Sequence, residues 1–465
     1  MSYRLQVTSS KLALAATLAF ALQGVSAEQI EDKLMIVLPQ EIVQATVEHS
    51  PLLRSSDQEI EAAKARQAQA AASGLPSLDL SGRAARYDGL VDSSLGPTLT
   101  IPALEERYSA SATLTQPLYT GGRILNQKRS AAFQRRAAEA TRRGAEADVT
   151  LQALTAYWNW SKAFRSLETL QSAVDRMQAH ADDMQNLHAA GLATDNDKLA
   201  TDVLLEQTRL RLEEARRRVD LARARIAFLT GQELPVHAAP KAASITADLS
   251  AASEADSLDT AMSNRTERVA RQMDTSSAMA QVKAARADFF PRLSLLAGYE
   301  TANPNSLFFP PADEWNDDSF VGVAVSWNIF DSGLTRAKAH EAAARAAQAR
   351  LRQGQEDEGI TLEVREARAN LQDALERVTV AERTEQSARQ NLDAATDLWQ
   401  NGLARHSDVL DAHAQLTEAQ YQAVVARVDA LLARAGLDHA IGLLNAQHHE
   451  PDTKPFPDSL ATTEP

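Results

Sequence analysis

The sequence predicts a mainly α-helical chain with a membrane β-barrel part, built from two structural repeats. Each repeat is expected to contain a strand pair followed by a long helical hairpin. Three observations predict this fold class: glycine landmarks that recur at a constant spacing, two very long stretches without proline, and short segments of alternating polarity before each of them. In assembled form we expect a trimer with a twelve-stranded barrel.

The first 27 residues are typical of a signal peptide. Arg4 and Lys11 give a basic start, and residues 12–22 form an apolar run that is too short to span a bilayer. Residues 25–27 (Val-Ser-Ala) then supply small side chains at a cleavage position, so we expect cleavage after Ala27. The alternative is an amphipathic N-terminal helix of a cytosolic protein.

The composition excludes some kinds of binding partner and some kinds of metal or modification site. The chain has 62 acidic and 48 basic residues and no cysteine. Phosphate binding requires clustered Lys and Arg, so we expect no nucleic-acid partner. Without cysteine there is no thiolate metal site and no residue to acylate beside the cleavage position. No later segment has the apolar length of a membrane helix, which leaves a soluble protein or a β-barrel.

The same landmarks occur twice along the chain. Gly122 and Gly333 lie 211 positions apart, and the same offset relates Gly191 to Gly402, and Asp197 to Asp408. These matches place the first repeat at 28–231 and the second at 257–445, each opening with an Ala-rich helix. The segment 232–256, rich in Ala, Pro and Ser, is typical of a linker, and the Pro-rich tail 446–465 of a flexible end.

Strand pairs are expected at about 77–119 and about 292–330. In the second pair, Val321, Val323, Val325, Trp327 and Ile329 alternate with Gly322, Ala324, Ser326 and Asn328. This period of two, with one apolar and one small polar face, fits strands between lipid and water. Four strands in one chain would leave unpaired edges in lipid, so several chains must share a barrel; three chains give twelve strands and room for a passage.

Long helices are expected at about 123–189 and about 334–400, with return helices at about 193–230 and about 405–444. Each long helix would be on the order of 100 Å and must pack along its length to be stable. Turns from strand to helix fall at Gly121, Gly122 and Gly333, because glycine adopts positive φ at little cost.

The doubled order of strand pair, long helix, tip glycine and return helix resembles the TolC family of outer-membrane efflux and secretion proteins. Residues 115–122 (Thr-Gln-Pro-Leu-Tyr-Thr-Gly-Gly) carry this resemblance, as do Gly402-Leu403 and the following Asp-Val-Leu-Asp at 408–411. It implies a homotrimer in the outer membrane of a Gram-negative bacterium, with a twelve-stranded barrel and an α-helical tunnel that extends into the periplasm. It also implies outer-membrane lipid, a periplasmic adaptor (membrane fusion) protein and an inner-membrane transporter as partners.

The implied function is the exit duct of a tripartite export system, a passive conduit gated at its periplasmic end. Type I protein secretion and small-molecule efflux both remain open, as do an ABC-type and an RND-type transporter. A periplasmic adaptor, which would carry one hairpin, and a structural coiled-coil protein, which would lack strand pairs, are the alternatives.

Asp408 and Asp411 are the expected selectivity residues of the periplasmic gate. They are three positions apart on the return helix, so they share a face, and they match the family's acidic rings. Six carboxylates around a three-fold axis would favour cations. In a single chain the same pair would be an ordinary solvated acidic face.

The resemblance also implies a latch that closes this gate. Trp399 stands at the family's tyrosine position, and Asp197 stands at the acceptor position in the first repeat. The family's arginine position holds Ala404, with Arg405 one residue later and therefore about 100° around the helix. We therefore expect an altered latch. The tips that would meet the adaptor are Gly191, Leu192, Gly402 and Leu403.

Catalytic sites are not expected, and neither are cofactors or metals. Residues 405–408 (Arg-His-Ser-Asp) contain Ser, His and Asp, but neighbours on a helix point in different directions and form no triad. The sequence has no glycine-rich phosphate loop, so the energy for transport must come from a partner. The chain is expected not to be an enzyme.

Overall fold

The computed structural model describes residues 35–94, 96, 100–101, 103–241, 253–309 and 311–445. The expected signal peptide and the expected tail lie outside the described residues. The chain divides into two compact units. Unit 1 comprises Met1–Ser50, Asp148–Ala252 and Glu366–His439, and unit 2 comprises Pro51–Ala147, Ser253–Arg365 and Ala440–Pro465.

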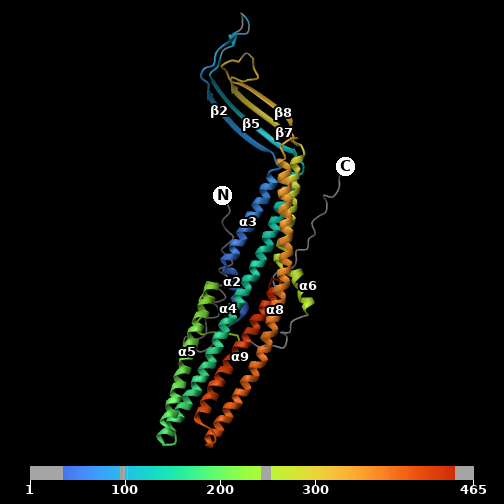
Figure 1. Ribbon diagram of the computed structural model, residues 1–465. Helices are drawn as coiled ribbons and strands as arrows, with labels where there is room; N and C mark the ends of the chain where they lie inside the picture. Colours follow the sequence, from blue (N-terminus) through green and yellow to red (C-terminus); the bar gives the residue numbers. More distant parts are fainter. Residues whose placement is uncertain are drawn as a thin grey trace, which may run out of the picture. The chain divides into compact units, whose positions relative to one another are not determined.

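Unit 2 contains a four-stranded antiparallel sheet in the order β2-β5-β7-β8 (Figure 1). Its strands are β2 (Ser77–Arg86), β5 (Glu106–Tyr119), β7 (Arg292–Asn303) and β8 (Asn316–Ser326). Each repeat supplies one hairpin, and the two hairpins join through β5 and β7. The outer strands β2 and β8 each pair on one side only within the described chain. Short strands β3 (Ser93–Ser94) and β4 (Thr100–Ile101) pair with each other.

The register sorts the side chains of this sheet onto two different faces. Val321 pairs with Ala297, Ala297 pairs with Leu114, and Leu114 pairs with Leu78. Since side chains alternate along a strand, one face is mainly apolar across all four strands. The apolar face carries Leu78, Leu80, Ala112, Leu114, Leu293, Leu295, Ala297, Val321, Val323 and Val325. The opposite face carries Asp79, Ser81, Ser111, Thr113, Ser294, Glu300, Asp318, Gly322, Ala324 and Ser326.

The second strand pair is shorter than the sequence suggests. β8 ends at Ser326, so Trp327 and Ile329 lie beyond it although they continue the alternating pattern. The indole Nε1 of Trp327 donates a hydrogen bond to the carbonyl of Phe289 at 3.1 Å. Periodicity continued past the last ladder hydrogen bond, so it could not mark the end of the strand.

Glycine is required where strands turn into helices. Gly121, Gly122 and Gly333 have φ values of 62°, 85° and 89°. A Cβ added at Gly121 would lie 2.6 Å from the carbonyl oxygen of Ala287. A side chain at Gly121 would therefore clash with the backbone, and the residue would also have an unfavourable φ.

Gly121→Ala is expected to destabilise the protein by about 1–3 kcal/mol, from the left-handed φ and the clash together. The matched control is Gly359→Ala, within α8 (Leu334–Gln400), where a Cβ would meet none of the described atoms within 4 Å. That control should stabilise the helix by about 0.5–1 kcal/mol. Urea unfolding of the two variants would measure both changes, and equal stability would contradict the assigned role of Gly121.

The remaining helical elements of unit 2 complete this unit, and a buried arginine lies at one junction between them. They are α3 (Pro51–Ala72), α6 (Glu254–Asn264), α7 (Thr266–Arg286), the 3-10 turns Ala287–Phe289 and Leu443–Asn445, and the first parts of α4 and α8. Arg265 stands between α6 and α7, and its side chain is only 8% exposed.

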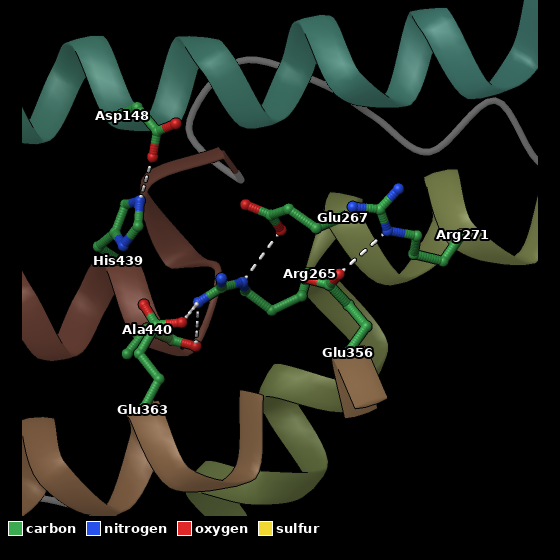
Figure 2. Close-up of polar contacts among 8 residues, drawn as sticks. All are labelled: Asp148, Arg265, Glu267, Arg271, Glu356, Glu363, His439 and Ala440. Carbon is green, nitrogen blue, oxygen red and sulfur yellow. Dashed lines mark hydrogen bonds and ion pairs between the residues drawn. The ribbon is translucent and has the colours of Figure 1, made fainter. Parts of the chain in front are cut away.

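Figure 2 shows the partners of this arginine. Its Nε lies 3.0 Å from a carboxylate oxygen of Glu267, and its Nη1 lies 2.8 Å from one of Glu363. Nη1 also donates to the carbonyl of Ala440 at 3.2 Å. Burial alone would lower the pKa of Arg265, but the hydrogen bonds and charges of the two glutamates raise it above its ordinary value. Arg265 thus joins three segments of unit 2.

Unit 1 is built from two helical hairpins. The first combines α4 (Arg123–Ala189) with α5 (Asp195–Thr230), and the second combines α8 with α9 (His406–Ala440) (Figure 1). α4 and α8 each contain 67 residues and pass through both units. Apolar clusters fill the hairpins, one around Leu170, Met177 and Leu205, and others around Leu416 and Val378.

Part of the expected linker is structured. β6 (Ala238–Pro240) pairs in parallel with β1 (Met35–Val37), which precedes α2 (Pro39–His49). The buried hydroxyl of Tyr157 donates to the carbonyl of Val37 at 2.9 Å and accepts from the backbone N–H of Lys241 at 3.0 Å. These bonds hold the strand pair against the core. Nothing in the composition of 232–256 indicated this pairing.

Across the described ranges, none of the helices combines the length and the apolar character needed to cross a membrane.

Candidate functional site at the helical tips

Both hairpins of unit 1 turn in the same way. At the first tip, the N–H of Leu192 donates to the carbonyl of Leu187 at 2.9 Å, and that of Gly191 donates to His188 at 2.9 Å. At the second tip, Leu403 donates to Leu398 at 2.8 Å and Gly402 donates to Trp399 at 2.9 Å. These bond pairs define Schellman motifs, which end a helix at a left-handed glycine.

The tip residues suit this geometry and leave an apolar side chain exposed. Gly191 and Gly402 have φ values of 75° and 71°, which only glycine adopts readily. The leucines that follow them, Leu192 and Leu403, are each 76% exposed. The four residues expected to meet an adaptor therefore form the protruding ends of the two hairpins.

Asp197 takes part in the cap at the N-terminus of α5. Its carboxylate accepts from the backbone N–H of Thr194 at 3.2 Å and from the Thr194 hydroxyl at 2.6 Å. In return, the Thr194 hydroxyl oxygen accepts from the N–H of Asp197 at 3.2 Å. This reciprocal capping box lowers the pKa of Asp197, chiefly through the hydrogen bond from the Thr194 side chain.

Asp408 occupies the same position in the second repeat. Its carboxylate accepts from the backbone N–H of Arg405 at 3.1 Å. The guanidinium of Arg405 has no acceptor, so it cannot complete a capping box as Thr194 does. Asp408 and Asp411 are both exposed on α9. Asp408, one of the two expected gate carboxylates, therefore also caps the start of α9.

The expected latch residues are not brought together. In the part of the chain that the structure describes, neither Trp399 nor Arg405 forms a hydrogen bond with Asp197, and Arg405 is exposed. The ring of Trp399 instead packs against two histidines, with centroid distances of 6.0 Å to His180 and 5.4 Å to His406. In the single chain the Asp197 carboxylate accepts from Thr194 instead, and a latch that involves Asp197 stays a prediction.

Three histidines meet beside the tips. His180 of α4 stacks on His406 of α9, with centroids 5.2 Å apart, and lies 5.1 Å from His413. The side chain of Thr201 on α5 is 2.8 Å from the Nε2 of His406. This histidine cluster (His180, His406 and His413) therefore connects the first hairpin to the second.

The sequence analysis missed this cluster. His406 and His413 are seven residues apart and so share a face of α9, which is the one signal in the sequence. His180 lies on a different repeat, and no spacing rule relates it to them. No group of three or more His, Asp or Glu with metal-binding geometry occurs among the residues with described positions.

Comparisons with known proteins identify relatives of this chain. The family model for outer membrane efflux proteins matches residues 42–232 and 258–443. OprJ, an outer membrane protein of Pseudomonas aeruginosa, is 26% identical over 408 residues, which cover 86% of this chain and 81% of OprJ. The cation efflux system protein CusC of Escherichia coli is 32% identical over 141 residues, and this match spans only 30% of each chain.

Solved structures show the same fold. A crystal structure of CusC superposes with a TM-score of 0.74 at 20% identity, covering 91% of this chain and 96% of that one. The outer membrane protein VceC of Vibrio cholerae gives a TM-score of 0.72 at 21% identity, covering 87% of this chain and 96% of VceC.

Proposed function

Because this chain belongs to the outer membrane efflux protein family, we propose that three copies form a passive export channel with a gate at the helical tips. The channel would lie in the outer membrane, extend into the periplasm and work with a periplasmic adaptor and an inner-membrane transporter. The main supporting observation is the two-faced sheet with two open edges, supplied by a chain whose two repeats both match the family.

The sheet supports assembly from several copies. Its apolar face suits lipid, and its polar face suits a water-filled lumen. Within the described residues, β2 and β8 each have one edge without a partner strand; unpaired backbone groups there would be costly in hydrocarbon, which favours pairing with other copies. Three copies would give twelve strands and leave a passage, whereas two would give a barrel filled by its own side chains.

Unpartnered apolar stripes on the helices support the same assembly. On α5, the exposed residues of the stripe fall within about 40° of one another around the helix. They are Leu199, Val203, Leu210, Leu221 and Phe228. On α8, the exposed Leu351, Leu362, Val380 and Leu398 fall within about 20°. Stripes this narrow are typical of helices that pack against another helix.

Charge favours pairing of α5 with the groove between α8 and α9. The groove has a volume of 1090 Å³, and its lining includes Asp373, Glu376, Glu418 and Asp429. The sequence of α5 is rich in arginine, with seven between Arg209 and Arg225. Opposite charges around an apolar seam set which surfaces meet. We propose that α5 of one copy packs on this groove of the next.

The proposed channel can be tested directly. The full-length protein, extracted from outer membranes in detergent, should migrate as a heat-sensitive trimer. It should also form conducting channels in planar bilayers. A monomer that is extracted without detergent and carries no current would refute the proposal.

Replacing both exposed aspartates with asparagine, Asp408→Asn/Asp411→Asn, should reduce cation selectivity. It should also weaken block by a trivalent cation roughly tenfold or more, because six carboxylates would attract that ion together. Asparagine can still accept the N–H bond that caps α9, so the fold should be kept. Single-channel recording from the periplasmic side measures both effects.

The control is Asp202→Asn, which removes an exposed carboxylate from α5 without touching the second tip. Wild-type selectivity in the double variant would assign Asp408 and Asp411 to an ordinary solvated helix face.

A further inference from the structure

We propose that the histidine cluster is an acid-sensitive joint, whose protonation loosens the contact between the first hairpin (α4/α5) and the second (α8/α9). Its effect on conductance rests on the gate proposed above. The acid-induced loosening of the contact between the hairpins does not depend on that gate.

The joint depends on neutral imidazole rings. The Thr201 hydroxyl donates to the carbonyl of Asp197 at 2.8 Å, so its oxygen accepts from the Nε2–H of His406. His406 is therefore protonated on Nε2, and its Nδ1 carries the lone pair that an added proton would take. Among the described residues, neither that Nδ1 nor the Nε2 of His180 has a hydrogen-bond partner, and both atoms are buried. Protonation would place a charged N–H where nothing accepts it.

Several positive charges around the cluster disfavour an added proton. His180 and His413 lie 5.1 Å apart and would repel each other once both were charged. Arg176 of α4, whose guanidinium donates to Gln420 of α9 at 3.0 Å, adds a positive charge that disfavours protonation of His413. Arg389 of α8 adds another positive charge that acts on Arg176.

Two carboxylates act in the opposite direction, and neither is well placed to neutralise the cluster. Asp183 of α4 favours the charged form of His180, but it is exposed to solvent. Asp197 of α5 favours the charged form of His406, but its carboxylate already accepts two hydrogen bonds from Thr194. Burial therefore has the larger influence on all three histidines.

Burial, followed by the charges of His180, Arg176 and His406, lowers the pKa of His413 to about 4. Burial also lowers the pKa of His180 and of His406. A histidine released to water regains a pKa of about 6.5. When the two hairpins separate (the parted state), the histidines therefore bind protons that they do not bind while the hairpins are in contact (the joined state). The joint is therefore strongest above about pH 6.5 and weakens as the pH falls toward about 4. His413 alone would shift the equilibrium toward parting by about 30-fold at pH 5.

Hydrogen exchange on the full-length assembled protein tests this joint. At pH 5, amides in residues 180–201 and 399–413 should exchange at least about tenfold faster than at pH 7.5, after correction for intrinsic rates. Amides of α7, in unit 2, serve as the internal reference.

Two variants remove the titrating groups while keeping polar side chains. His413→Gln should abolish most of the acid effect, and His180→Gln/His406→Gln/His413→Gln should abolish all of it. The glutamine amide can replace the Nε2–H donor of His406 toward Thr201. The control is His188→Gln. His188 bonds Asp195 at 2.7 Å within the first hairpin alone, so this variant should respond to acid as the wild type does.

An unchanged acid response in His413→Gln and in the triple variant would overturn the proposal. Bilayer recordings at both pH values then separate the two claims. Acid-accelerated exchange with unchanged conductance would support the joint and contradict the gate.

Discussion

Val323→Arg should prevent assembly of the barrel, whereas Ala324→Arg should be tolerated. Val323 lies on the apolar face of the sheet, paired with Leu295, and is 60% exposed in the single chain. Arginine on the lipid face near the bilayer midplane costs about 2–4 kcal/mol, and a trimer would meet that cost three times. Ala324 pairs with Ser294 on the polar face, where an arginine would meet water.

Val325 and Ser326, the last two residues of β8, also point to opposite faces, but substitutions there would give a less clear comparison. Ser326 pairs with Arg292, so a new arginine there would also meet a like charge. The amount of heat-sensitive trimer in the outer-membrane fraction gives the readout. Equal yields of both variants would contradict the assignment of the faces.

Arg265→Met should lower the free energy of unfolding by about 2–3 kcal/mol. The change leaves the carboxylates of Glu267 and Glu363 and the carbonyl of Ala440 without the donor that joins them. Breaking a fully buried ion pair costs about 3–5 kcal/mol. The value expected here is smaller because Glu267 and Glu363 are 29% and 40% exposed, so water solvates them in part.

The matched control is Arg365→Gln. Arg365 also pairs with a glutamate, Glu254, at 2.9 Å, but the two side chains are 60% and 53% exposed. Exposed pairs of this kind contribute about 0–1 kcal/mol. Urea unfolding followed by circular dichroism compares the two variants. If Arg265→Met lowers the free energy of unfolding no more than Arg365→Gln does, burial adds nothing to the stability contributed by the Arg265 contacts.

Local sequence signals were sufficient for the long helices, the tip turns and the two-faced strands. Positions needing positive φ were marked by glycine at residues 121, 191 and 402, because few other residues adopt that conformation. The absence of proline over long stretches indicated α4 and α8, since proline would break a helix of that length. The alternation in β8 indicated a two-faced strand.

Contacts between segments that are distant in the sequence could not be predicted from local sequence signals. The pairing of β6 with β1 depends on three backbone positions and a tyrosine more than eighty residues away. The histidine cluster depends on how α4 packs against α9, and His180 carries no local mark of that neighbour. The latch expected around Asp197 rested on aligned positions, and the hydrogen bonds of Thr194 to that carboxylate became visible only in three dimensions.

The strand order β2-β5-β7-β8 also constrains when the sheet can form during the life of the chain. Tyr108 pairs with Asn303 and Tyr119 with Leu293, so the central ladder cannot close until the chain has been synthesised and exported as far as β7, in the second repeat. Closing so long a loop is slow compared with forming either hairpin. In the proposed trimer the last two edges would then wait for other copies, so insertion into lipid would coincide with the meeting of chains. The yield of finished barrels should therefore rise more steeply than in proportion to the amount of chain exported.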